Sequence, residues 1–135
     1  MSAHPVFVDT SALLALVNVN DAHHGEAIRI FRELAAAEAP LVTHSYVLVE
    51  AGALVRRRFG PAAFNRVGET VRRSALVVWV DERLHCAAWE KAAAGGRKGP
   101  GLVDHVSFLV MREMDVGLVA TFDGHFSKQG FRTLP

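Results

Sequence analysis

The chain has 135 residues, of which 50% are hydrophobic and 21% are charged, and its formal net charge at pH 7 is +1. This composition excludes a disordered chain, and the small net charge gives no global argument for nucleic-acid binding. The length suits a single domain over residues 1–135 that buries a proper core. Charged residues or glycines interrupt every apolar run before it reaches the length of a membrane span, so we expect no membrane association.

Strands and helices are predicted to alternate along the chain. Apolar strands are expected at residues 5–9, 41–43, 76–80, 117–121 and 131–134, and the strand at 76–80 has the composition of a fully buried one. Helices are expected at residues 12–17, 24–37, 45–59, 61–74, 81–94 and 102–114. This alternation is typical of a parallel sheet with helices on both faces, so the predicted fold class is α/β, a three-layer α/β/α sandwich.

The only cysteine, Cys86, excludes an intrachain disulfide and suits a reducing compartment. Residues 1–5 carry neither the basic region nor the hydrophobic segment of a leader peptide. We therefore expect a cytoplasmic protein. Because Cys86 lies in a segment with helical character, we expect its thiol to be buried and inert.

Four acidic residues stand among apolar neighbours: Asp9, Glu50, Asp104 and Asp123. A carboxylate in such surroundings loses much of its hydration, so it must be paired, protonated or bound to a metal. No arginine or lysine lies beside any of the four in an equally apolar segment, whereas one cation can neutralise several carboxylates at once. Oxygen ligands without a companion cysteine favour Mg²⁺ or Mn²⁺ over zinc. Asp9 and Asp123 end predicted strands and Asp104 begins a helix. These positions are compatible with the side chains of the acids meeting at one edge of the sheet.

The segments around these acids closely resemble the PIN-domain ribonucleases, and in particular the VapC-type toxins of toxin–antitoxin pairs. The matching segments are VDTSALL at residues 8–14, VE at 49–50, LVDHVSF at 102–108 and ATFDGHF at 120–126. The resemblance covers essentially the whole chain. It implies a five-stranded parallel sheet between helices, with the first and fourth strands adjacent.

The resemblance also implies the roles of individual residues. It assigns four residues to a metal-binding, catalytic acidic quartet for Mg²⁺, with Mn²⁺ as the alternative ion: Asp9, Glu50, Asp104 and Asp123. Glu50 either ligates the ion or orients the attacking water. Three hydroxyl residues match positions that line or support such a site: Thr10, Ser11 and Thr121. For Ser11, helix capping is an equally good explanation.

Basic residues near the acidic cleft are expected to contact the RNA backbone. Arg97 and Lys98, in the glycine-rich loop before Asp104, are the first candidates, and the second pair is Arg56 and Arg57. A solvated helix face explains the arginines as well.

Two histidines flank two of the acids. For both His105 and His125, packing or hydrogen bonding beside the site is favoured over a general acid–base role, since metal-activated water does not need them.

The resemblance implies a metal-dependent endoribonuclease that hydrolyses phosphodiester bonds in structured RNA, either a ribosomal RNA loop or tRNA. Residues 81–82, 89–90 and 121–127 favour the ribosomal loop, on resemblance alone. The implied partners are a cognate VapB-type antitoxin and a second copy of the chain in a homodimer.

Two other functions are alternatives to the nuclease. The first is a catalytically silent PIN domain that serves as an RNA-binding or assembly module, and the intact quartet argues against it. The second is a phosphotransfer or receiver domain, which also places aspartates at strand ends. Asp9-Thr10-Ser11 lacks the second aspartate that aspartate-nucleophile phosphatases need.

Overall fold

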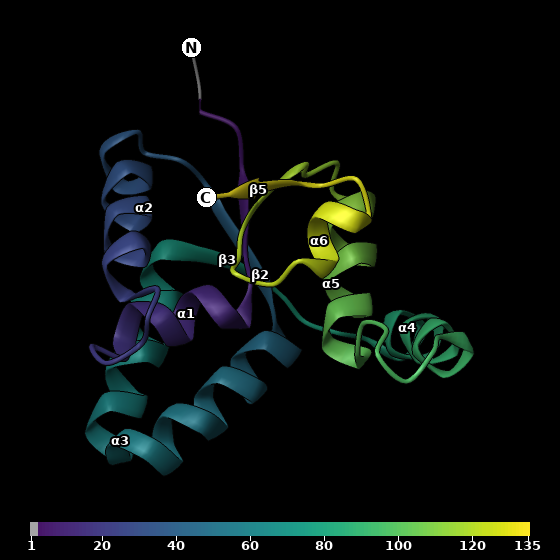
Figure 1. The fold of residues 1–135 in the computed structure, drawn as a ribbon, viewed down its shortest axis with the longest axis horizontal. Helices are drawn as coiled ribbons and strands as arrows, with labels where there is room; N and C mark the ends of the chain where they lie inside the picture. The colour runs from purple at the N-terminus through teal and green to yellow at the C-terminus, as the bar shows by residue number, and fades with distance from the viewer. Residues whose placement is uncertain (1–2) are drawn as a thin grey trace.

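The computed structural model describes residues 3–135, and its centre is one parallel sheet (Figure 1). The strands are β1 (Val6–Val8), β2 (Leu41–His44), β3 (Ala75–Val78), β4 (Leu118–Ala120) and β5 (Arg132–Leu134). They lie in the order β3-β2-β1-β4-β5, and every neighbouring pair is parallel. The predicted α/β fold and the adjacency of the first and fourth strands are therefore confirmed.

The helices are α1 (Thr10–Val17), α2 (His24–Ala36), α3 (Ser45–Ser74), α4 (Glu82–Ala94), α5 (Leu102–Glu113) and α6 (His125–Lys128). Figure 1 shows α1 and α2 on one side of the strands and α5 and α6 on the other. None of the helices within residues 3–135 combines the length and the apolar character needed to cross a bilayer.

The predicted break between two helices lies inside α3. Gly60 there has φ 89° and ψ 176°, a conformation that a residue with a side chain rarely adopts. Pro61 follows directly and starts the second half, where its missing N–H costs no helical hydrogen bond. The two halves of α3 consequently meet at an angle (Figure 1).

Helix α6 had not been predicted, since four residues are too few to show a helical period.

The prediction that residues 76–80 form a fully buried strand is wrong. Strand β3 is an edge strand that pairs only with β2. Leu76 is 58% exposed, and Trp79, just beyond the strand, is 74% exposed. The apolar composition of this segment therefore does not reflect burial on both faces.

The prediction of a buried Cys86 is also wrong, because its side chain is exposed. Helix α4 buries Leu84 and Ala88, which lie one turn apart on the same face. Cys86 is midway between them in sequence, and the helical rotation of about 100° per residue turns it to the opposite face.

The largest fully buried side chains lie between the sheet and α5 and α6. Phe7, Phe108 and Phe126 are fully buried. The centroids of the Phe108 and Phe126 rings are 5.0 Å apart in an edge-to-face arrangement. This contact fixes α5 and α6, which carry Asp104 and His125, against the sheet.

We predict that Phe108→Ala lowers the free energy of unfolding by about 3–5 kcal/mol, because it leaves a cavity in this core. Leu76→Ala on the exposed edge strand is the control and is expected to cost less than about 1 kcal/mol. Urea unfolding followed by circular dichroism measures both. Equal losses for the two variants would contradict the assigned position of the core.

Candidate active site

The site is built where two adjacent parallel strands end. Strand β1 pairs with β4 so that Val8 lies opposite Ala120. The amide of Asp9 donates a hydrogen bond of 3.1 Å to the carbonyl of Ala120. Asp9 and Thr121 therefore emerge side by side at the carboxyl edge of the sheet, where α/β proteins bind their ligands.

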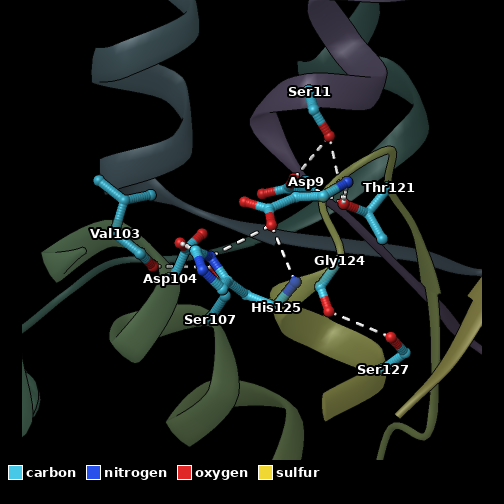
Figure 2. A network of polar contacts seen from close by, with 10 residues as sticks. Asp9, Ser11, Val103, Asp104, Ser107, Thr121, Gly124, His125 and Ser127 are labelled. Carbon is cyan, nitrogen blue, oxygen red and sulfur yellow. Dashed lines mark hydrogen bonds and ion pairs between the residues drawn. The ribbon is translucent and has the colours of Figure 1, made fainter. Parts of the chain in front are cut away.

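The Asp9 carboxylate is held by two hydroxyl groups from different strand ends. Ser11 Oγ and Thr121 Oγ1 donate to the same oxygen, Asp9 Oδ2, at 2.7 and 2.8 Å (Figure 2). In turn the backbone amides of Phe122 and Asp123 donate to Ser11 Oγ and Thr121 Oγ1 at 2.9 and 3.0 Å. Each hydroxyl has one proton, so when both protons go to Asp9, none is left for the 3.2 Å contact between the two hydroxyl oxygens.

Burial raises the pKa of Asp9, which is 3% exposed, and the hydrogen bonds from Ser11 and Thr121 lower it in part. Ser11 and Thr121 thus contact Asp9 and support its charged form. Thr10, the third hydroxyl residue expected at the site, lines a cleft together with Asp9 and Ser11. Its buried Oγ1 has no hydrogen-bond partner among residues 3–135.

A second cluster joins Asp104, in the first turn of α5, to Asp123 and His125. His125 Nδ1 lies 3.2 Å from Asp123 Oδ1 and 3.5 Å from Asp104 Oδ2. One ligand atom from each of these three residues lies within 4.8 Å of the others, close enough to hold a metal ion together. Figure 2 shows the imidazole of His125 beside the Asp104 carboxylate.

The pKa of Asp104 is raised to about 6, first by burial and then by the negative charges of Asp9 and Asp123. The repulsion that Asp104 receives from Asp9 and Asp123 shows that the three carboxylates lie close together. Like charges held together in this way disfavour ionisation until a cation compensates them.

Glu50 lies at the same open cleft, whose volume is about 510 Å³ and which is lined by Asp9, Glu50, Asp104 and Asp123. The inference that Glu50 is poorly hydrated is wrong, because the residue is exposed. Its neighbours Val47 and Ala51 are buried, but Val49 is 70% exposed. A run of apolar residues in a helix covers all its faces, so it did not reveal which face Glu50 occupies.

Sequence reasoning missed the buried His44, which links α3 to α5. Its Nδ1 accepts the N–H groups of Tyr46 and Val47 at 3.2 and 3.3 Å and so caps α3. Nε2 then carries the proton and donates to Ser107 Oγ at 2.8 Å, and Ser107 donates to the Val103 carbonyl at 3.0 Å. Burial lowers the pKa of His44 to about 4, so the ring is neutral at pH 7. Histidine is a rare helix cap, which is why no sequence signal marked it.

The candidate RNA-binding residues are all exposed and lie outside the lining of the cleft: Arg56, Arg57, Arg97 and Lys98. Leu54 and Glu50, one turn apart on α3, both line the cleft. Arg57 continues this face about two turns after Glu50, whereas Arg56 is turned away from it by about a third of a turn. Arg97 and Lys98 belong to the loop that leads into Gly101 at the cleft wall.

Comparison with known proteins gives consistent relationships over the whole chain. Residues 6–132 match the PIN domain family model. Two curated proteins named "23S rRNA-specific endonuclease VapC20", from two strains of Mycobacterium tuberculosis, are 36% identical over 132 residues, covering 93% of this chain and 95% of theirs.

A solved structure agrees with the sequence comparison. The crystal structure of Mycobacterium tuberculosis VapC20, described as a sarcin-ricin loop cleaving toxin, superimposes with a TM-score of 0.82 and 34% identity, covering 93% of this chain and 95% of that one. The relatives named above are a VapC-type endonuclease and toxin. The chain therefore belongs to the PIN-domain family.

Proposed function

We propose that this protein is a metal-dependent endoribonuclease toxin of the VapC type, acting as a single domain. The observation that carries the proposal is the convergence of Asp9, Asp104 and Asp123 at one cleft, where burial and then the charges of Asp9 and Asp123 raise the pKa of Asp104 to about 6. A silent RNA-binding module has no use for this repulsion, and its phosphate ligand would be repelled by the carboxylates. The endonuclease relatives support the same choice.

The residues at the cleft fit a divalent cation. Within residues 3–135 no lysine or arginine forms an ion pair with Asp9, Asp104 or Asp123, and the buried Nδ1 of His125 faces two of these carboxylates without a hydrogen-bond partner. Asp9, Asp104 and Asp123 would hold the ion, Mg²⁺ or Mn²⁺, with Glu50 as a further ligand or as the residue that orients the attacking water. When bound, such an ion lowers the pKa of water, holds phosphate oxygens and stabilises the leaving oxygen.

The protein's own residues would prepare the site for hydrolysis. The hydroxyls of Ser11 and Thr121 occupy one oxygen of Asp9 and so fix the direction of the other. His44 and Ser107 connect the helix of Glu50 to the helix of Asp104, which sets the width of the cleft between them. Glu50 is exposed at the cleft, where an incoming water is within its reach.

For the substrate we propose a structured loop of large-subunit ribosomal RNA, the class named for VapC20. An exposed loop can present a splayed backbone to an open cleft more readily than a continuous duplex can. Arg57, Arg97 and Lys98 would contact its phosphates, with Arg56 further from the cleft. Action on ribosomes places the protein in the cytoplasm. A VapB-type antitoxin and a homodimer complete the proposal, as the family resemblance implies.

We predict that Asp104→Asn reduces RNA cleavage by at least about 100-fold, because it removes a negative ligand from the centre of the cluster. The control is Asp115→Asn, an exposed acid with φ 55°, a conformation that asparagine tolerates. Cleavage of large-subunit ribosomal RNA in Mg²⁺ or Mn²⁺, with the cut ends mapped, measures both. Cleavage by Asp104→Asn at the wild-type rate would contradict the assigned site.

We predict the opposite effect of Asp104→Asn on the stability of the metal-free protein. The pKa of Asp104 is about 6 in the folded protein and 3.8 for an ordinary aspartate, which stands for the unfolded chain. The folded protein therefore becomes more stable as pH falls from about 6 to about 4, and above pH 6 the charged Asp104 destabilises it. Asparagine carries no charge, so the variant should be about 1–3 kcal/mol more stable than the wild type at pH 7 and no more stable at pH 4. Urea unfolding in EDTA at both pH values measures this difference, and a variant less stable than the wild type at pH 7 would contradict the electrostatic account.

We predict that Arg57→Ala weakens RNA binding and reduces the slope of log affinity against log salt by about 1, because one phosphate contact is lost. Arg56→Ala provides the matched control, since the same side chain is removed from a different face of α3. RNA binding is measured by filter retention at several salt concentrations, with Asp104→Asn as the background to prevent cleavage. Equal effects of the two substitutions would show that this face of α3 does not bind the RNA backbone.

A further inference from the structure

His125 presents a buried nitrogen to two carboxylates. Its Nδ1 has no hydrogen-bond partner among residues 3–135, although Asp123 Oδ1 is 3.2 Å away and Asp104 Oδ2 is 3.5 Å away. The backbone N–H of His125 donates to the same Asp123 oxygen at 2.9 Å, which ties the start of α6 to Asp123. The ring is therefore placed beside the acids by the chain itself.

A protonated ring would form ion pairs with both carboxylates at these distances, whereas a neutral ring needs another positive charge beside it. A neutral ring with its lone pair on Nδ1 would face two carboxylate oxygens and be repelled by them. A proton on Nδ1 would need to be directed at one of the oxygens, yet neither contact has hydrogen-bond geometry. A cation among the three groups would satisfy the nitrogen lone pair and both oxygens at once.

The distances agree with this arrangement. Ligand atoms in adjacent positions around an ion, each at about 2.1 Å from it, are separated by about 3 Å. The separations of 3.2 and 3.5 Å between Nδ1 and the two carboxylate oxygens come close to this value. The set of Asp104, Asp123 and His125 is also the one whose ligand atoms all lie within 4.8 Å of one another.

We propose that Nδ1 of His125 is a nitrogen ligand of the divalent ion, so that the site prefers a transition-metal ion such as Mn²⁺ to Mg²⁺. The inference rests on the proposed metal-dependent function and specifies its cofactor. Mg²⁺ takes oxygen ligands, whereas imidazole suits transition ions such as Fe²⁺, Ni²⁺ and Zn²⁺ best, and Mn²⁺ lies between Mg²⁺ and these ions in its affinity for nitrogen. Sequence analysis had favoured oxygen ligands alone, because His125 lies two residues beyond Asp123 and only the turn at residues 123–125 brings its ring back to the acids.

The test uses the full chain with Mn²⁺ as the probe and pulsed electron paramagnetic resonance as the readout. A directly bound imidazole gives the Mn²⁺ spin echo a modulation from ¹⁴N. His125→Asn and His125→Gln remove the imidazole and offer an amide oxygen instead, which is a harder ligand. His105→Asn is the matched control, because His105 adjoins Asp104 in sequence but lies outside the three-residue cluster. Thermal unfolding confirms that each variant is folded.

We expect the ¹⁴N modulation in the wild type and in His105→Asn and its absence in both His125 variants. The Mn²⁺ affinity of the His125 variants should fall at least about tenfold, as expected for a lost ligand contact. Their Mg²⁺ affinity, measured by competition, should change by less than about threefold, since an amide oxygen suits this ion. Mn²⁺ bound by the wild type without ¹⁴N modulation would overturn this inference and leave the proposed function intact. Failure of the wild type to bind either ion would overturn both.

Discussion

The pairing of β1 with β4 is the constraint on which the site depends. Its register sets Val8 opposite Ala120, and the chain then delivers Asp9 from one strand and Thr121 and Asp123 from the other. A slip of this register would separate Asp9 from the Thr121 hydroxyl that binds it at 2.8 Å. The pairing also brings Asp9 and Asp123 to the edge that Asp104 of α5 faces, and the pKa of Asp104 is raised first by burial and then by these two charges. The buried aromatic contacts beneath α5 and α6 supply the packing that holds this repulsive arrangement in place.

A neutral histidine provides the second support, at a different place in the fold. His44 can accept two backbone N–H groups at the start of α3 only while its Nδ1 is unprotonated, and burial secures this by lowering its pKa to about 4. The remaining N–H is then committed to Ser107, one turn after the Asp104 segment in α5. The helix of Glu50 and the helix of Asp104 are thereby joined through polar atoms that carry no net charge. A charged group at this position would have added to the electrostatic strain of the neighbouring acids or required its own partner.

Several parts of the site were predictable from the sequence because they follow from local rules. An acid at the end of an apolar strand marks the carboxyl edge of a parallel sheet, and this rule placed Asp9 and Asp123 at that edge, whereas the adjacency of their strands was implied by the family resemblance. Burial on a helix face was less predictable where apolar residues surround the helix, which is why Glu50 was expected to be less hydrated than it is. The exposure of β3 depends on strand order, a property of the whole sheet that composition does not carry. His44 caps α3 and bonds to Ser107, which is distant in the sequence, and a turn at residues 123–125 brings His125 back to the acids. Neither position is marked by a periodic sequence pattern.

The balance of charges at the cleft connects the fold to the proposed chemistry. A stable domain that merely bound RNA would gain from neutral residues at the strand ends, since isolated carboxylates disfavour both the folded state and a phosphate ligand. The chain instead keeps three such groups and adds hydroxyls that lower the pKa of Asp9, which favours its charged form. These features oppose stability in the absence of a cation and favour binding in its presence. Nδ1 of His125 has no hydrogen-bond partner among residues 3–135 and lies 3.2 and 3.5 Å from two of these carboxylates, so a positive charge between the three groups would stabilise them together. The repulsion among Asp9, Asp104 and Asp123 would therefore be the source of the affinity for the metal ion that we propose.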